Sequence, residues 1–220
     1  MRDVPLRDAL PDHESEKDLR ILVIDDKQNH RDSATETLKG HEVSVASSYD
    51  EATRLMEPAY DEAIEEKHLR DAGVTKQNPA FVNTDEGKER WKAYWAARKS
   101  AHSAAEIPFP FEVVLTDMMM PMGDWNTLRD ACDPSQQIPY GFVLALRAAQ
   151  RGAKWVAMVT DTNHHKGAMS AAIDCIGDSY YSGKEADFQI NGAKVRFVHA
   201  PFCEDGISKD WGRVLADLVK

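Results

Sequence analysis

Acidic residues directly follow two apolar segments that have the composition of buried strands. Residues 21–24 (Ile-Leu-Val-Ile) precede Asp25 and Asp26, and residues 113–116 (Val-Val-Leu-Thr) precede Asp117. The carboxyl ends of parallel strands form the edge of an α/β sheet at which ligands bind. Three carboxylates gathered at that edge are hard oxygen ligands of the kind that suits Mg²⁺. The sequence therefore predicts a magnesium site made by Asp25, Asp26 and Asp117.

The elements that must position these carboxylates alternate between strand-like and helix-like segments along the chain. Strands are predicted at residues 20–24, 42–46, 112–116, 155–159 and 194–199. Helices are predicted at residues 29–39, from residue 49 onward, and at residues 141–151, 167–176 and 208–219. Such alternation implies right-handed crossovers and a parallel sheet covered by helices on both faces. We therefore expect the α/β class, with a doubly wound sheet of five parallel strands.

A long charged insertion, residues 57–110, interrupts this pattern and contains a predicted helix at residues 84–105. Insertions of this length in compact domains are usually functional or disordered. Trp91, Tyr94 and Trp95 are spaced to share one face of the helix. We favour the interpretation that they pack against the body of the domain. The alternative is an exposed face that binds a partner, since aromatic residues are enriched at such anchors.

Two other features define the domain organisation. The dipeptide at residues 191–192 (Asn-Gly) is a strong hairpin signal and predicts that residues 188–190 pair with the strand from residue 194. Residues 1–18 are charged and carry two prolines, which predicts a flexible N-terminal tail. A single domain is then expected over residues 19–220.

Composition and charge argue against several functional classes. The net charge of −10 argues against non-specific binding to nucleic acid. No apolar run is long enough to cross a membrane, and the N-terminus lacks the apolar stretch of a signal peptide. The three cysteines are widely spaced and form no CxxC pair, as expected for a reducing cytoplasm. We therefore expect a cytoplasmic protein that binds neither nucleic acid nor membranes.

The chain resembles the receiver domain of two-component response regulators. The strand and acidic pair at residues 21–26, the Thr-Asp-Met-Met-Met-Pro run at residues 116–121 and the strand-end hydroxyl of Thr160 occur in the order typical of that family. The resemblance covers about residues 19–56 and 111–220, with gaps. It implies a flavodoxin-like sheet with the strand order 2-1-3-4-5.

The resemblance also implies roles for individual residues. Asp117 would be the phosphoryl acceptor, and the three carboxylates together with the backbone carbonyl of Met119 would hold Mg²⁺. Thr160 would contact the phosphoryl group, and Phe197 would be an aromatic switch that converts the new charge into altered packing. Enzyme activity would be limited to self-phosphorylation and to dephosphorylation of the aspartyl phosphate.

Partners follow from the same resemblance. A receiver takes its phosphoryl group from a histidine kinase or a phosphotransfer protein. Because no output domain is visible after the last strand, we expect a stand-alone receiver that signals by contact with a downstream protein. The chain could also bind a second copy of itself and form a homodimer.

Two positions depart from the family pattern. Ala200 replaces the lysine that pairs with the phosphoryl group, which removes a charge-assisted partner. Asp161, directly after Thr160, adds negative charge beside the acidic pocket. Side chains that could compensate for the missing lysine are Lys27, Lys166, His164 and His199.

These departures support alternative functions. One is a degenerate pseudo-receiver that acts as a phosphorylation-independent protein-interaction module. Another is a small Mg²⁺-dependent enzyme built on the same fold. His164, His165 and His199 are the accessory candidates, and the first two would serve such an enzyme.

Overall fold

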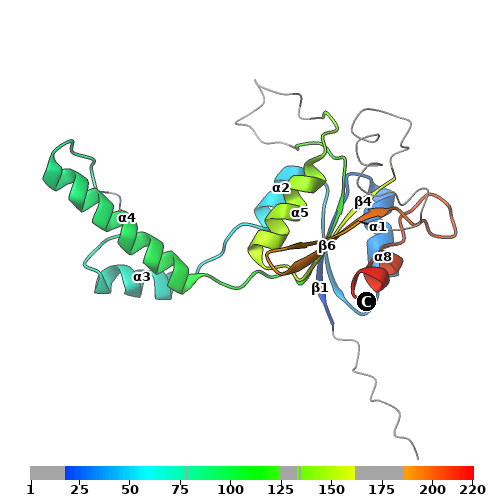
Figure 1. Cartoon of the computed structure of the whole chain (residues 1–220), viewed down its shortest axis with the longest axis horizontal. Helices are drawn as coiled ribbons and strands as arrows, with labels where there is room; N and C mark the ends of the chain where they lie inside the picture. The colour runs from blue at the N-terminus through cyan, green and yellow to red at the C-terminus, as the bar shows by residue number, and fades with distance from the viewer. Residues whose placement is uncertain (1–17, 78, 124–132, 134, 162–185) are drawn as a thin grey trace, which may run out of the picture.

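The structure is a computed structural model that describes residues 18–77, 79–123, 133, 135–161 and 186–220 (Figure 1). The strands are β1 (Arg20–Ile24), β2 (Glu42–Ala46), β3 (Val113–Asp117), β4 (Trp155–Thr160), β5 (Ala186–Ile190) and β6 (Ala193–His199). The helices are α1 (Gln28–Thr37), α2 (Tyr49–Leu55), α3 (Glu62–Asp71), α4 (Asp85–Ala105), α5 (Tyr140–Arg151) and α8 (Trp211–Leu218). The chain therefore belongs to the α/β class, as expected.

One sheet of six strands contains every strand in this part of the chain, in the order β2-β1-β3-β4-β6-β5. All neighbouring strands are parallel except β5, which runs antiparallel to β6. The expectation of five strands in the order 2-1-3-4-5 is therefore wrong in strand count and in order. The mostly parallel sheet remains compatible with a flavodoxin-like arrangement.

The additional edge strand results from the turn between β5 and β6. Asn191 and Gly192 have φ values of 50° and 84°, the left-handed conformations that a tight hairpin turn requires. They fold β5 back onto β6, so that Phe188 lies opposite Val195. The hairpin predicted from this dipeptide is thus confirmed, and it accounts for the sixth strand.

Helices cover both faces of the sheet, with α2 and α5 on one side and α1 and α8 on the other (Figure 1). Along β1, Leu22 and Ile24 belong to the apolar cluster under α2 and α5, whereas Ile21 and Val23 belong to the cluster under α1 and α8. Burial on both sides explains why this strand is a continuous apolar run rather than an alternating one.

The helix ends agree with most of the sequence signals. Ser48 accepts a hydrogen bond from the backbone N–H of Glu51 at 3.3 Å and caps α2, as its position predicts. The last helix begins at Trp211 and not at residue 208, because Lys209 forms a β-bridge with Phe202 before Asp210 caps α8. The predicted start of that helix is therefore wrong, and the difference places Lys209 outside it.

Helices α3 and α4 form an arm that extends away from the sheet (Figure 1). A short stem closes its base, where the N–H of Ile107 donates to the Ala59 carbonyl at 2.8 Å. Tyr94 is buried inside the arm, whereas 43% of Trp95 is exposed. The favoured interpretation, that these aromatic residues pack against the body of the domain, is therefore wrong.

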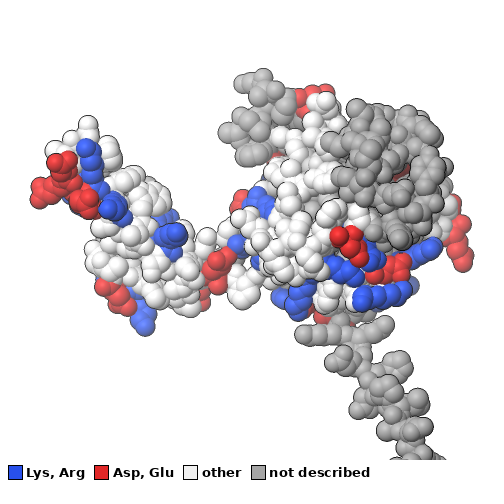
Figure 2. Space-filling model, viewed as in Figure 1, with Lys and Arg blue, Asp and Glu red and all other residues white. Residues whose placement is uncertain are grey.

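The surface carries both signs of charge. Figure 2 shows Lys and Arg interspersed with Asp and Glu over the visible face of the arm and the body. Among the helices that the structure describes, none is both long and apolar enough to cross a bilayer. Residues 1–17 of the tail predicted at residues 1–18, and the whole of the helix predicted at residues 167–176, lie outside the described residues.

Candidate functional site

The predicted carboxylates meet at the carboxyl edge of the sheet. Strands β1 and β3 are parallel neighbours in which Ile24 lies beside Thr116, so the residues that follow these two positions reach the same edge. Asp25, Asp26 and Asp117 each place a carboxylate oxygen within 4.8 Å of the others. Asp25 is fully buried and Asp117 is nearly so. The three residues form what we call the acidic cluster.

Lys209 enters the acidic cluster from the loop that precedes α8. Its ammonium Nζ donates to Asp25 Oδ2 at 2.7 Å and to Asp117 Oδ1 at 2.8 Å. The residue has no exposed surface, and its Nζ also lies 3.4 Å from the carbonyl oxygen of Val159. Sequence reasoning did not single out this lysine, since it assigned residue 209 to a helix. A cation therefore lies at the carboxylate of Asp117 although residue 200 is alanine.

Burial controls the protonation of the acidic cluster. Burial raises the pKa of the Asp117 carboxyl to about 7; the charge of Lys209 opposes this shift and that of Asp25 adds to it. Burial would lower the pKa of the Lys209 ammonium, but the charges of Asp117 and Asp25 outweigh that effect and raise it. One ammonium is thus shared by two buried carboxylates, which leaves negative charge in excess.

The acidic cluster has the properties of a site for a small divalent cation. When all three carboxylates are ionised, they and the one ammonium leave two negative charges in excess, which one Mg²⁺ would balance. Asp26 Oδ2 accepts a hydrogen bond from Gln137 at 2.6 Å, but Asp26 Oδ1 is buried and has no hydrogen-bond partner among the residues that the structure describes. A buried carboxylate oxygen without a donor is costly unless a cation satisfies it. The residues present therefore fit Mg²⁺.

The negative charge of Asp161 is compensated beside the acidic cluster and not within it. Lys27 Nζ donates to Asp161 Oδ2, and Nε2 of the buried His30 lies 3.6 Å from the same oxygen. These two partners, His30 first, hold the pKa of the Asp161 carboxyl well below its usual range. Lys27 is thus paired with Asp161, whereas Lys209 is the lysine that donates to Asp117.

Two further predicted site residues lie on neighbouring strands. Thr160 is buried at the end of β4, where its carbonyl accepts the N–H of Ala200 at 2.8 Å. Phe197 on β6 is buried, and its ring stacks on that of Phe142 in α5 with centroids 6.4 Å apart. Met119 is partly buried two residues beyond Asp117, and the role of its carbonyl as a ligand stays a prediction.

Helix α5 begins directly against the strand that carries Asp117. The N–H of Gly141 donates to the carbonyl of Met118 at 3.1 Å. A Cβ at residue 141 would lie 2.3 Å from the carbonyl oxygen of Asp117, so only glycine permits this approach. The start of α5 therefore fixes the backbone at Asp117.

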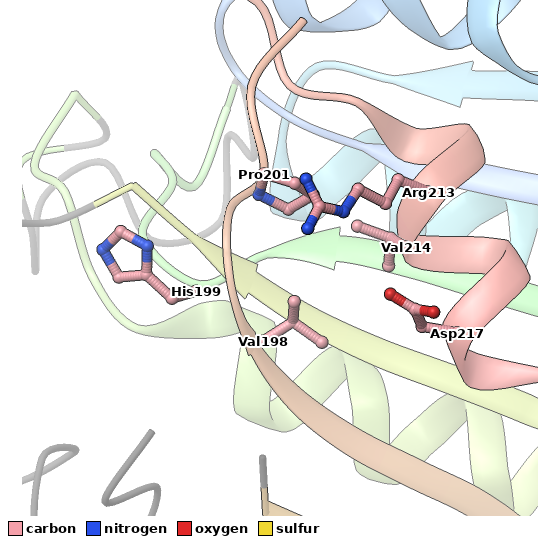
Figure 3. Close-up of a pocket in the computed structure, with 6 residues that line it drawn as sticks. All are labelled: Val198, His199, Pro201, Arg213, Val214 and Asp217. Carbon is pink, nitrogen blue, oxygen red and sulfur yellow. The ribbon is translucent and has the colours of Figure 1, made fainter. Parts of the chain in front are cut away.

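Of the predicted accessory histidines, the structure describes only His199, which lies away from the acidic cluster. His199 is exposed at the end of β6 and lines a groove of about 200 Å³ between β6 and α8 (Figure 3). In that view its ring points away from Arg213 and Asp217. The described residues that line this groove include none of the three carboxylates. His164, His165 and Lys166 lie outside the described residues.

The resemblance to receivers rests on the residues and geometry of this chain alone. Comparison of the chain with models of protein families, with curated proteins and with solved structures finds no match in any of the three.

Proposed function

We propose that the chain is a receiver domain of a two-component phosphorelay, which accepts a phosphoryl group on Asp117 with Mg²⁺. The observation that carries the proposal is the buried acidic cluster with the Lys209 ammonium at the carboxyl edge of the sheet. The strand order supports it, because β2-β1-β3-β4-β6 follows the receiver order once the edge strand β5 is treated as an addition.

Each residue of the acidic cluster has a role in this reaction. A carboxylate oxygen of Asp117 attacks phosphorus and forms a P–O bond, while the bond from phosphorus to the donor imidazole breaks and the imidazole takes up a proton from solvent. Asp25 and Asp26 would hold Mg²⁺, which, when bound, neutralises charge on the phosphoryl oxygens. Lys209 pairs with a phosphoryl oxygen, the role that a lysine at residue 200 would have had.

The response to phosphorylation would reach the surface through buried neighbours of the site. Thr160 contacts the new phosphoryl group, and Phe197 transmits the change to α5 through its stacked partner Phe142. Because a packed core switches between discrete arrangements, such a shift can alter an entire helix face.

The arm is the proposed contact surface for a downstream protein. Its exposed apolar residues include Phe81, 59% exposed, and Trp95, 43% exposed. Their rings pack edge-to-face against Trp91, with centroids 5.7 and 5.8 Å away. Exposed aromatic residues of this kind are typical anchors of protein interfaces. A histidine kinase or phosphotransfer protein remains the proposed phosphoryl donor.

The proposal is tested by phosphorylation without a kinase. The full chain is incubated with acetyl phosphate and Mg²⁺, and intact-mass spectrometry counts phosphoryl groups; beryllofluoride binding is measured in parallel. We expect one group on the wild type and on Asp161→Asn, and none on Asp117→Asn. Asp161→Asn is the matched control because it removes a neighbouring carboxylate that is not the acceptor. Modification that persists in Asp117→Asn would show that the acceptor lies elsewhere.

One observation favours the pseudo-receiver as a second candidate. Lys209 already neutralises much of the charge on Asp25 and Asp117, so the acidic cluster can persist as a structural ion network without metal. The same experiment separates the two functions. A pseudo-receiver would take up no phosphoryl group and no beryllofluoride at any Mg²⁺ concentration.

A further inference from the structure

The lysine of the acidic cluster comes from a loop and not from the end of a strand. Lys209 follows the loop at residues 202–208, and its backbone is joined to α1 by two hydrogen bonds. Its N–H donates to His30 Nδ1 at 3.2 Å, and its carbonyl accepts from the Ser33 hydroxyl at 2.8 Å. All three residues are buried. Helix α1 thus holds both polar backbone groups of the residue whose side chain reaches the acceptor.

The close contact between α1 and α8 supports the same arrangement. The indole N–H of Trp211, two residues after Lys209, donates to the carbonyl of His30 at 2.7 Å. A Cβ at Gly212 would lie 2.4 Å from the carbonyl oxygen of Thr37, so the two helices meet where glycine permits it. His30 therefore accepts hydrogen bonds from Lys209 and Trp211, the residues on either side of Asp210, which caps α8.

The contacts of His30 define its tautomer. Because Nδ1 accepts the N–H of Lys209, the ring proton lies on Nε2. That nitrogen faces Asp161 Oδ2 at 3.6 Å, which is long for a hydrogen bond and acts as an electrostatic contact. The carboxylate of Asp161 therefore favours the tautomer that leaves Nδ1 free to accept.

We propose that His30 is a positioning residue for the phosphoryl site: it fixes the backbone of Lys209 so that this lysine reaches the acceptor carboxylate. A lysine side chain has a flexible stem, and holding its backbone reduces the entropy lost when its ammonium pairs with a phosphoryl oxygen. The effect on phosphoryl binding rests on the function proposed for Asp117, whereas the effect on the metal-free acidic cluster does not.

The proposal predicts an uncommon pattern of two opposite effects. Lys209 donates to the carboxylates that would hold Mg²⁺ and also supplies a partner to the phosphoryl group. Lys209→Met should therefore bind Mg²⁺ more tightly and bind beryllofluoride roughly ten- to hundredfold more weakly. His30→Leu should shift both affinities in the same directions by smaller factors. General damage to the fold would weaken both ligands together.

The experiment compares four variants of the full chain with the wild type by calorimetric titration of Mg²⁺ and then of beryllofluoride in saturating Mg²⁺. They are His30→Leu, His30→Asn, Lys209→Met and the double variant of His30→Leu with Lys209→Met. We expect His30→Asn to resemble the wild type, since its side-chain oxygen can accept the N–H of Lys209. Because His30 acts through Lys209, the double variant should differ from Lys209→Met by less than about twofold in its affinity for Mg²⁺ and for beryllofluoride.

Two results would overturn the proposal. His30→Leu could bind both ligands as the wild type does, or it could weaken beryllofluoride equally with and without Lys209. Hydrogen exchange of the Lys209 amide provides a readout without any ligand, and we expect faster exchange in His30→Leu than in His30→Asn. If the wild type binds no beryllofluoride, the function proposed for Asp117 fails, and the exchange and Mg²⁺ measurements still decide the role of His30.

Discussion

Replacing Lys209 with methionine removes the ammonium of the acidic cluster and keeps most of the apolar stem. In the metal-free protein, Asp25 and Asp117 then lose a donor at 2.7 and 2.8 Å in a place with almost no solvent. Removing one partner of a buried ion pair costs about 3–5 kcal/mol, because the remaining charge is left uncompensated. We therefore expect Lys209→Met to lower the free energy of unfolding by about 3 kcal/mol at pH 8.

The loss should be smaller at lower pH. Burial already raises the pKa of the Asp117 carboxyl to about 7, and loss of the Lys209 charge removes an influence that lowers it. At pH 6 the native state of the variant can take up a proton on Asp117 that the unfolded state does not bind, which stabilises the native state. At pH 8, where the full effect is expected, the loss of about 3 kcal/mol in the free energy of unfolding of Lys209→Met corresponds to a fall in Tm of about 6–12 °C.

The assay is urea unfolding followed by circular dichroism at pH 6 and pH 8, with and without millimolar Mg²⁺. Mg²⁺ should restore much of the lost stability, since it supplies positive charge to the same carboxylates. Lys27→Met is the matched control, because Lys27 is 47% exposed and pairs with Asp161 at the rim, where we expect less than about 1 kcal/mol. If the two variants are equally stable at pH 8 without metal, Lys209 does not neutralise the acidic cluster.

Four further predictions follow from the site and the fold. Mg²⁺ should raise the Tm of the wild type by relieving repulsion in the acidic cluster, and Asp26→Asn, measured by the same thermal scan, should lose that rise. Without metal, the free energy of unfolding should fall as pH rises from about 4 to about 7, because the raised pKa of Asp117 lets the native state keep a proton that the unfolded state has lost. In urea titrations, Asp117→Asn should remove this dependence of stability on pH. Replacing residues 60–106 with a Gly/Ser linker should leave the circular dichroism spectrum of an α/β fold and the Mg²⁺ response intact, since the stem already brings the ends of this segment together. The same change should abolish partner binding in a pull-down or self-association in light scattering. Ala200→Lys should destabilise the fold by about 1–3 kcal/mol in urea unfolding and should not increase beryllofluoride binding.

The sequence was sufficient to predict a mostly parallel α/β sheet and the acidic cluster, because both depend on local patterns. Buried parallel strands are continuous apolar runs, and strand-end residues of neighbouring parallel strands reach one edge. Asp25 and Asp117 were therefore identifiable before any contact was known. The turn at Asn191 was equally local, and it predicted the hairpin that supplies the sixth strand.

The arm shows where local patterns stop being informative. Thr84 caps α4 as its position suggests, accepting the N–H of Gly87 at 3.1 Å. The spacing of Trp91, Tyr94 and Trp95 indicates that one helix face is covered, but it does not say by what. In the structure the segment between α3 and α4 contacts two of them, with Phe81 against Trp91 and the Lys76 carbonyl accepting from the Tyr94 hydroxyl, and Trp95 remains exposed. Which surfaces meet is a tertiary property that periodicity cannot define.

Ala200 and Lys209 show the same limit at the site itself. Ala200 is 4% exposed and belongs to the apolar cluster that includes Trp211, so a lysine there would bury a second ammonium close to one that already occupies the carboxylates. Read one position at a time, the alanine suggests a degenerate site. Considered together with Lys209, the alanine fits the proposed function: relative to the receiver pattern that the chain resembles, the lysine lies nine residues further along the chain, and residue 200 is too small to compete with it. The proposed phosphoryl transfer requires a cation at the carboxylate of Asp117, and the fold can supply that cation from any segment that α1 holds close enough.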